Sequence, residues 1–185
     1  MIIKKTANLL INFTIKRLAE IFGLFVFGAG VLLLIALLSY SPEDPNFIFP
    51  DNMEIKNILG FQGSFISDLF FQSLGLISFM LAFTLIFTGI SIFRIKEFFL
   101  IIENIFFSVI YSIFGSLFLS HYYSNAFDLY INGNGGFVGN YLDKTFLNSL
   151  ILFNETIFYY TLIVFILILF LISINFHPKK ILSYS

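Results

Sequence analysis

Four long apolar segments dominate this 185-residue sequence and limit the folds open to it. An α-helix needs about 20 apolar residues to cross the ~30 Å hydrocarbon layer of a bilayer. The sequence predicts four such spans, at about 21–40, 69–93, 98–120 and 157–176. Only 11% of the residues are charged, which is too few to cover a water-soluble particle of this size. We therefore expect an all-α membrane protein that has the lipid bilayer as its solvent.

The connections between these spans differ in length. Only residues 94–97 separate the second span from the third, so these two helices must be antiparallel neighbours. The other two connections, 41–68 and 121–156, are long and hold most of the acids and all but one of the Pro residues. This spacing predicts two helical hairpins in tandem, one formed by the first two spans and one by the last two.

Basic residues gather on one side of the predicted spans. Eight of the ten lie at the chain ends or in the short turn, and these are Lys4, Lys5, Lys16, Arg17, Arg94, Lys96, Lys179 and Lys180. The long connections hold only Lys56 and Lys144, but most of the acids, among them Asp51 and Asp128. Because cations are retained in the cytoplasm, we expect both termini and the short turn to be cytoplasmic.

The two ends of the chain flank the spans. Residues 1–20 are predicted as a cytoplasmic leader, either an amphipathic helix on the anionic inner leaflet or a solvated segment, and residues 177–185 as the start of a cytoplasmic linker. A cleaved signal peptide is disfavoured, because the apolar stretch is longer than a signal core and no small-x-small site follows it.

A short repeat marks the ends of both long connections. Gly60-Phe61-Gln62-Gly63 and Gly136-Phe137-Val138-Gly139 coincide at an offset of 76 residues, and Gly135 adds a further glycine to the second copy. Glycines permit positive φ and close backbone approach, so each copy is predicted to be a turn that begins a short amphipathic helix in an external loop. The favoured interpretation is that this helix folds against the membrane surface or dips into it. A phosphate-binding loop is disfavoured, since no strand and no Lys-Ser/Thr pair accompany the glycines. One face of the first helix would hold Phe65, Leu69, Gln72 and Leu76.

Small residues recur at a period of four along the third span. They are Ser108, Ser112, Ser116 and Ser120, with Gly115 beside them. Such a stripe favours close helix packing, either within one chain or between chains. The pairs Ala19 with Gly23, and Ser78 with Ala82, form weaker small-residue pairs on the first and second spans.

Glu103 is an acid inside a predicted span and is therefore a candidate functional residue. The favoured interpretation places it at the inner face, where it snorkels to the interface or pairs with Arg94 or Lys96. Proton or ion handling is the alternative.

Motifs for catalysis are missing from the sequence. It contains no nucleotide-binding loop, no H-E-x-x-H motif and no Cys, and His121 and His177 are predicted near opposite faces of the membrane. We expect no catalytic, cofactor-binding or metal-binding residues. The formal net charge of −1 also argues against direct nucleic-acid binding.

The residues that close the first span are distinctive. Ser41-Pro42-Glu43-Asp44-Pro45 is predicted as a structural stop, because Pro45 forces Asp44 towards an extended conformation. With the preceding Leu34–Tyr40 and the segment from Leu59 to Phe71, this phrase resembles the four-span N-terminal domain of FtsK/SpoIIIE-type DNA translocases. Gly135-Gly136-Phe137-Val138-Gly139 resembles the second external glycine motif of that family, and the resemblance covers about residues 15–176.

The resemblance implies a domain in the bacterial inner membrane at the division septum, with roles in cell division and chromosome segregation. It also implies a homo-oligomer, a hexamer in the family, and septal division proteins as partners. The family's ATPase motor and its winged-helix module are not recognised before Ser185, so no catalytic residue is carried over. We expect a membrane anchor and assembly domain. The alternative is a small four-helix transporter or channel subunit, for which only Glu103 and the serine stripe offer polar groups.

Overall fold

The computed structural model describes residues 2–45, 54–124 and 132–175. All the regular elements in these stretches are helices. They are α1 (Ile2–Leu38), α2 (Gly60–Leu74), the 3₁₀ turn η1 (Gly75–Ile77), α3 (Ser78–Ile95), α4 (Leu100–Tyr122), α5 (Gly136–Asp143), α6 (Phe146–Phe153) and α7 (Glu155–Ser173). Asp51, Asp128, His177, Lys179 and Lys180, which the sequence analysis singles out, lie outside the described residues.

Four helical segments are long and apolar enough to cross a membrane, as the sequence predicts. They are Leu9–Leu38, Gly60–Ile95, Leu100–Tyr122 and Glu155–Ser173. Their apolar residues are spread around the helix circumference, which is typical of helices surrounded by lipid. The prediction of an all-α, four-span membrane protein is confirmed.

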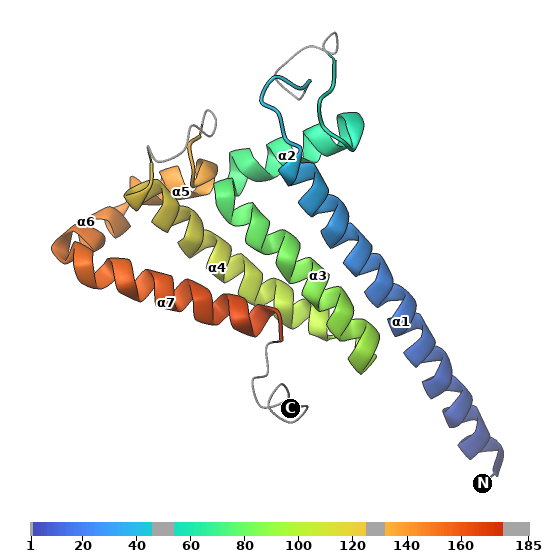
Figure 1. Ribbon diagram of the computed structural model, residues 1–185. Coiled ribbons are helices and arrows are strands. Elements are labelled where there is room, and N and C mark those ends of the chain that lie inside the picture. Colours follow the sequence, from blue (N-terminus) through green and yellow to red (C-terminus); the bar gives the residue numbers. More distant parts are fainter. Residues whose placement is uncertain (1, 46–53, 125–131, 176–185) are drawn as a thin grey trace, which may run out of the picture.

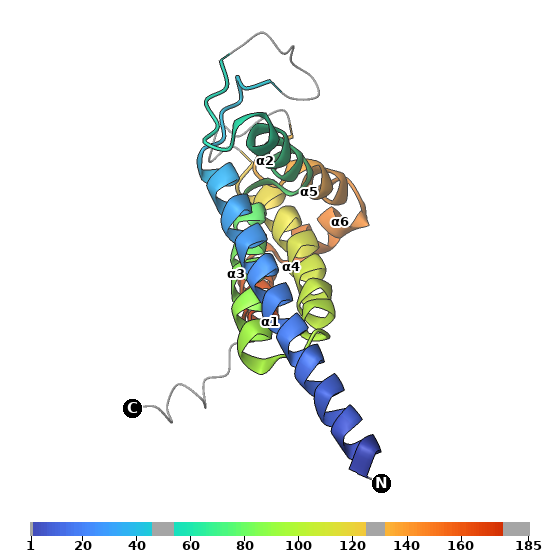
Figure 2. The ribbon, with the colours of Figure 1, turned by 90° about the vertical axis from the view of Figure 1, so that its right-hand side faces the viewer.

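The short helices gather at one end of the bundle. Figure 1 shows α2, α5 and α6 across the end at which α1 finishes, and we call this the loop end. The start of α1 and the turn between α3 and α4 lie at the opposite end, the turn end. Viewed from the side in Figure 2, α1, α3 and α4 run alongside one another.

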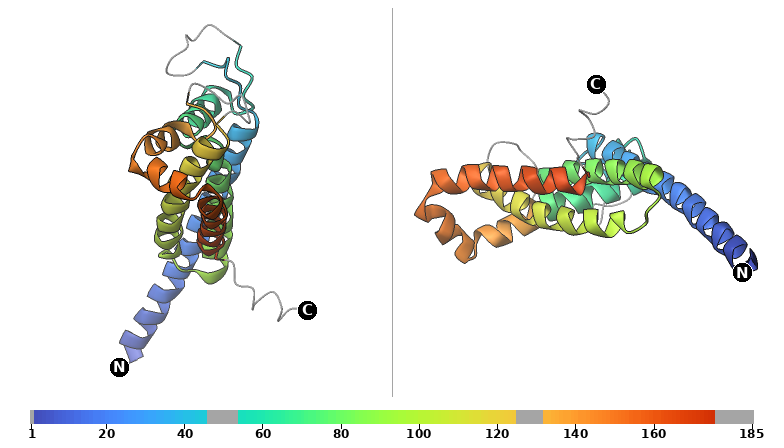
Figure 3. Two further views of the ribbon diagram at one scale, coloured as in Figure 1. Left: turned by 90° about the vertical axis from the view of Figure 1, so that its left-hand side faces the viewer. Right: turned by 90° about the horizontal axis from the view of Figure 1, so that it is seen from below.

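The long helices pack as two hairpins. The most extensive contacts join α1 to α3 and α4 to α7, while a smaller interface between α3 and α4 holds the hairpins together. Figure 3 shows α7 against α4 on the side away from α1. The tandem-hairpin arrangement predicted from the loop lengths is therefore observed.

The first hairpin has a glycine-based interface. A Cβ atom added to Gly23 would lie 2.7 Å from the backbone N of Phe93, and one added to Gly30 would lie 2.7 Å from that of Ile86. Gly89 on α3 is equally close to the backbone of α1. The two backbones can approach this closely only because these side chains are missing. The predicted small residue Ala19 is fully buried in the same interface.

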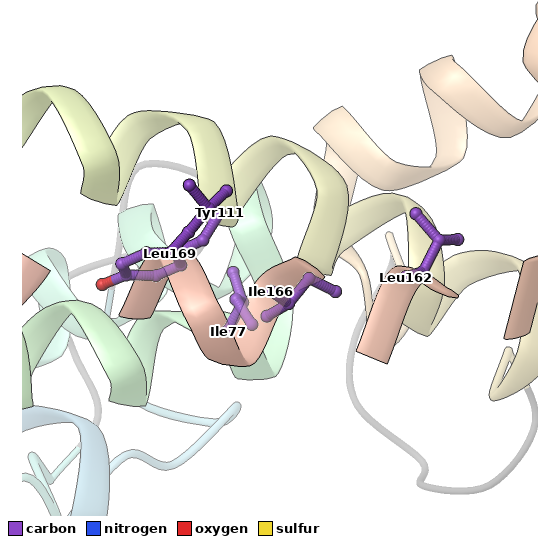
Figure 4. Close-up of a cluster of buried hydrophobic side chains, with 5 residues drawn as sticks. All are labelled: Ile77, Tyr111, Leu162, Ile166 and Leu169. Atoms are coloured by element: carbon purple, nitrogen blue, oxygen red, sulfur yellow. The ribbon is translucent and has the colours of Figure 1, made fainter. Parts of the chain in front are cut away.

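Two apolar clusters fill the bundle. One joins Ile77 of η1 and Tyr111 of α4 to three buried residues of α7 (Figure 4), which are Leu162, Ile166 and Leu169. In the other, Leu33, Leu37, Phe71 and Ala82 join α1, α2 and α3.

Two helix boundaries differ from the sequence prediction. The leader is not separate from the first span, because α1 is one helix from Ile2 to Leu38. This stretch contains no Pro that would break it. The predicted second span at 69–93 is divided, since Gly75 adopts a φ of +68° and ends α2 before α3 begins. Leu76 therefore lies beyond α2 and not on the helix face predicted for it.

Candidate functional site

The Ser41–Pro45 segment fastens the first long connection to the bundle. The Asp44 side chain is 1% exposed, and its two carboxylate oxygens accept hydrogen bonds from the backbone N–H groups of Lys56 and Asn57, both at 2.8 Å. The Pro45 carbonyl accepts a hydrogen bond from the Ser64 hydroxyl of α2 at 3.0 Å. The segment is thus more than a helix stop, because it holds residues that follow it in the chain.

Residues next to this segment complete the arrangement, which we call the loop clamp. The Asn57 amide donates to the Ala36 carbonyl of α1 at 2.9 Å, and the Ser39 hydroxyl accepts from the Ile58 backbone N–H at 3.2 Å. The Tyr40 hydroxyl donates to the buried carboxylate of Asp68 on α2 at 2.8 Å. These contacts were not predicted from the sequence, although the polar residues Asn57 and Asp68 flank the first glycine repeat.

An ion pair covers the outside of the loop clamp. The Lys56 ammonium group contacts the Glu43 carboxylate, and both side chains are exposed. The hydrogen bond and charge of Lys56 lower the pKa of Glu43, and Glu43 in turn raises the pKa of Lys56. Because both groups are solvated, this pair contributes little to stability.

The two copies of the glycine repeat have the same backbone conformation. Gly60 and Gly136 each begin a helix, with φ values of +65° and +64°. Gly63 and Gly139 lie on the buried sides of these helices, where an added Cβ would collide with Asn57 and Ser116, respectively. The prediction of positive φ and close approach is confirmed, with one role for each glycine of the pair.

The second copy packs against the C-terminal end of α2 at a site we call the glycine junction. The Leu76 backbone N–H donates to the Asn134 carbonyl at 2.9 Å, and a Cβ on Gly136 would lie 2.6 Å from the backbone N atoms of Leu74 and Gly75. Chain segments about 60 residues apart therefore touch through their backbones. Only glycine allows this contact.

Two residues of the serine stripe of α4 contact the glycine junction. The Ser116 hydroxyl donates to the Leu74 carbonyl at 2.9 Å, and Gly135 and Gly139 pack on the backbone of Ser116 and on Ser120. Gly115 lies against Ile77. The part of the predicted packing face around Ser116 and Ser120 thus joins elements within one chain, namely α4, α2 and α5. At the other end of the stripe, Ser108 donates to a carbonyl of its own helix.

A neutral polar network lies inside the bundle. Thr84 on α3 is within hydrogen-bonding distance of the Tyr111 hydroxyl of α4, at 2.8 Å, and of the Ser173 hydroxyl of α7, at 3.1 Å. The Asn104 amide donates to the Thr88 hydroxyl at 2.8 Å. All five side chains are buried. Thr84 and Thr88, four residues apart in an apolar span, are the sequence signal that could have revealed this network.

Glu103 does not pair with the cations suggested for it. Lys96 instead contacts Glu20 of α1, at 2.6 Å between Nζ and Oε1, and Arg17 contacts the other oxygen of Glu20 at 2.6 Å. Glu103 is exposed in the first turn of α4, where the helix dipole favours an acid. Of the two arrangements predicted for Glu103, the pairing with Arg94 or Lys96 is not observed, because α1 places Glu20 next to the turn. The position at the interface stays a prediction.

Among the described residues, the charged side chains that interact form small clusters of opposite charge. Among residues 2–45, 54–124 and 132–175, no three His, Asp or Glu side chains are grouped closely enough to hold a metal ion. His121 contacts the Asp143 carboxylate at 2.7 Å, at the loop end. Cavities of about 290 and 170 Å³ lie between the helices, and both are lined by uncharged residues.

Taken together, the fold and these sites define a class of protein, a four-span helical membrane domain braced at one end by a glycine-rich loop structure. Residues 15–183 match the family described as the 4TM region of DNA translocase FtsK/SpoIIIE, and the chain belongs to this family. The resemblance carried by the Ser41–Pro45 phrase is confirmed. The 4TM region is a membrane domain and not the motor of FtsK.

A curated relative supports the same assignment. The DNA translocase FtsK of Rhizobium meliloti (strain 1021) is 33% identical over 69 residues, which cover 37% of this chain and 8% of the relative. The matched part is thus a small portion of the relative's length. No solved structure matches this chain.

Proposed function

We propose that this chain is the membrane anchor and assembly domain of a septal DNA translocase that acts in cell division and chromosome segregation. The observation that carries the proposal is the match of residues 15–183 to the 4TM region of FtsK/SpoIIIE, on a four-span fold. The DNA-moving motor belongs to another part of such a translocase. This chain itself contacts no nucleic acid and needs no cofactor.

The proposed location is the bacterial inner membrane, with the turn end in the cytoplasm. The distribution of charge supports this orientation. Arg94 in the last turn of α3 and Lys96 just after it lie at the turn end. The loop end instead holds the acids Glu43, Asp44, Asp68, Asp143 and Glu155. Retention of cations on the cytoplasmic side then places the loop end outside.

Assembly is the second part of the proposal. The domain associates with further copies of itself, as a hexamer by family resemblance, and its loop end meets septal division proteins. Broad apolar surfaces on α1 and α7 are available for lipid or for neighbouring copies, for example Phe25 at 72% exposure and Ile157 at 60%.

Single cysteines test the orientation cleanly, because the chain contains no Cys. Glu97→Cys and Lys144→Cys are both at exposed positions, the first in the turn and the second at the loop end. In intact cells whose outer membrane has been permeabilised, a membrane-impermeant maleimide should label Lys144→Cys only. Labelling of Glu97→Cys alone would reverse the orientation.

The functional proposal is tested in dividing cells. A fluorescent fusion of this chain should concentrate in a band at the division site, and the same chain in nanodiscs should have the mass of an oligomer. A uniform distribution around the envelope together with a monomeric mass would contradict the proposal.

The transporter alternative has a separate test. If Glu103 handled ions or protons, proteoliposomes would show a flux that Glu103→Gln abolishes. We expect a leak that is the same with and without this substitution, because the buried network and the cavities contain no charged group. A flux that depends on Glu103 would replace the anchor proposal.

A further inference from the structure

The glycine repeat also carries a pair of aromatic residues in each copy. Phe61 and Phe65 lie four residues apart on α2 with ring centroids 6.3 Å apart, and Phe137 and Tyr141 occupy the same repeat positions on α5 with centroids 6.1 Å apart. Three of these side chains are strongly exposed, Phe61 at 47%, Phe137 at 60% and Tyr141 at 63%. The same aromatic ladder is thus present twice in one chain.

The opposite faces of these helices hold mostly small and polar residues. On α2, the buried side holds Gly63, Ser64, Ser67 and Asp68 as well as Phe71. On α5, the buried residues are Gly136 and Gly139. A water-facing helix would turn its apolar side inward. Both helices instead keep bulky rings on the outside, which is the arrangement expected of helices that contact lipid.

The chain itself fixes how far these helices lie from the spans. The last residue of α2 is Leu74, and the spanning helix α3 begins after the three residues of η1. On the other side, α6 follows α5 after two residues, and the spanning helix α7 starts directly after Asn154. Figure 1 shows α2, α5 and α6 lying across the ends of the long helices. Both aromatic pairs therefore belong to helices that lie at the ends of the spanning helices.

We propose that the repeated aromatic pairs, Phe61 with Phe65 and Phe137 with Tyr141, seat α2 and α5 in the bilayer at the boundary between headgroups and acyl chains. Aromatic side chains concentrate at this boundary in membrane proteins, and interfacial helices bury their apolar faces only a short way into it. The chain contains no Trp, so Phe and Tyr perform this role.

The occupant of this surface is the phospholipid bilayer and not a second protein. The bilayer that surrounds the exposed apolar surfaces of the four spans also extends to both copies of the repeat. Contact of lipid with two separate helices does not require a partner that has a matching symmetry. Exposed residues of the neighbouring α6 extend the same surface, with Phe146 at 73% and Phe153 at 90% exposure. This inference depends on the membrane fold and not on the septal role.

Single tryptophans test the depth of these helices, since any Trp fluorescence comes only from the introduced residue. Phe61→Trp and Phe137→Trp replace one exposed ring with another. Glu43→Trp, at an exposed loop position, is the control for water, and Val164→Trp, 54% exposed in the middle of α7, is the control for the hydrocarbon core. Each variant is reconstituted into phosphatidylethanolamine and phosphatidylglycerol vesicles that contain lipids brominated near the headgroup or near the chain end.

We expect Phe61→Trp and Phe137→Trp to emit at shorter wavelength than Glu43→Trp and to be quenched more strongly by the shallow bromines than by the deep ones. Val164→Trp should show the reverse order. Emission and quenching equal to those of Glu43→Trp would overturn the proposal in favour of a water-facing helix. Blue-shifted emission without quenching would overturn it in favour of a protein partner, and stronger quenching by deep bromines would overturn the interfacial depth. Tyr141→Trp provides the same readout if Phe137→Trp does not fold. A uniform distribution in cells would leave this result unchanged, so the two proposals fail separately.

Discussion

Gly60 and Gly136 separate two effects that glycine has on a chain. Both residues have a φ near +65°, so any other residue at either position is strained. Only Gly136 is also crowded, since an added Cβ would lie 2.6 Å from backbone atoms of Leu74 and Gly75, whereas Gly60 has nothing within 4 Å. The two copies of the repeat thus share one backbone conformation, but only the second copy makes a tight backbone contact at this glycine.

Alanine substitutions should distinguish the two effects. Gly60→Ala should destabilise the fold by about 1–2 kcal/mol, the cost of a left-handed conformation. Gly136→Ala should cost clearly more, because backbone atoms at the glycine junction cannot move aside as a flexible side chain can. Equilibrium unfolding in mixed micelles, followed by far-UV circular dichroism, measures both. Equal losses would show that the crowding at Gly136 is unimportant.

Neighbouring acids of the Ser41–Pro45 segment should also behave differently. Asp44→Ala removes the acceptor of the Lys56 and Asn57 N–H groups, and the buried Asn57 N–H alone should cost about 1–3 kcal/mol when it is left unsatisfied. Glu43→Ala removes only an exposed ion pair and should change the midpoint of thermal unfolding little. A larger effect at Glu43 than at Asp44 would contradict the loop clamp.

At the scale of elements, the pairing of α1 with α3 rests on missing side chains. Gly89 packs directly on the backbone of α1, whereas Gly28, on the same helix as Gly23, has open space around it. Gly89→Leu should therefore separate the helices and broaden or lower the unfolding transition. Gly28→Leu should be tolerated, since leucine has the higher helix propensity. If both variants unfold like the parent, the close approach does not stabilise this hairpin.

The second element-scale contact is the polar network between α3, α4 and α7. Thr84→Val keeps the shape of the side chain but removes its hydrogen bonds with Tyr111 and Ser173. Interhelical hydrogen bonds in membranes contribute about 0.6 kcal/mol on average, so we expect a loss of about 1 kcal/mol in total. The exposed Thr161→Val on α7 is the matched control and should have no effect. If the Thr84→Val variant had a higher free energy of unfolding than the parent chain, the network would be strained.

At the scale of the whole molecule, two hairpins meet at the glycine junction, along α3 and α4, and in the apolar cluster that joins Ile77 to α4 and α7. A chain divided at Glu97 and co-expressed as two halves should therefore reassemble and copurify. Gly136→Leu in the second half should greatly reduce copurification, while Gly60→Leu in the first half, at the same φ but in open space, should reduce it less. Loss of reassembly in the unsubstituted halves would contradict the two-hairpin description.

Much of this architecture could be predicted from the sequence. The four spans, their hairpin order and the helices that begin at Gly60 and Gly136 follow from hydropathy, loop length and glycine spacing, because each of these depends on nearby residues. The break at Gly75 and the continuous helix through residue 20 could not be predicted with the same certainty, since an apolar run does not reveal where a helix leaves the membrane.

The sequence by itself determined the solvent and the number of spans, because the free-energy cost of placing charge in lipid depends on local composition. It also contains the Ser41–Pro45 motif that points to the family. Only the tertiary structure decided the partners of each residue. It paired Lys96 with Glu20 instead of Glu103, and it placed Ser116 and Ser120 of the serine stripe against α2 and α5. The physical reason is that such contacts join residues far apart in the chain, and their energies depend on backbone approach distances that no local pattern encodes.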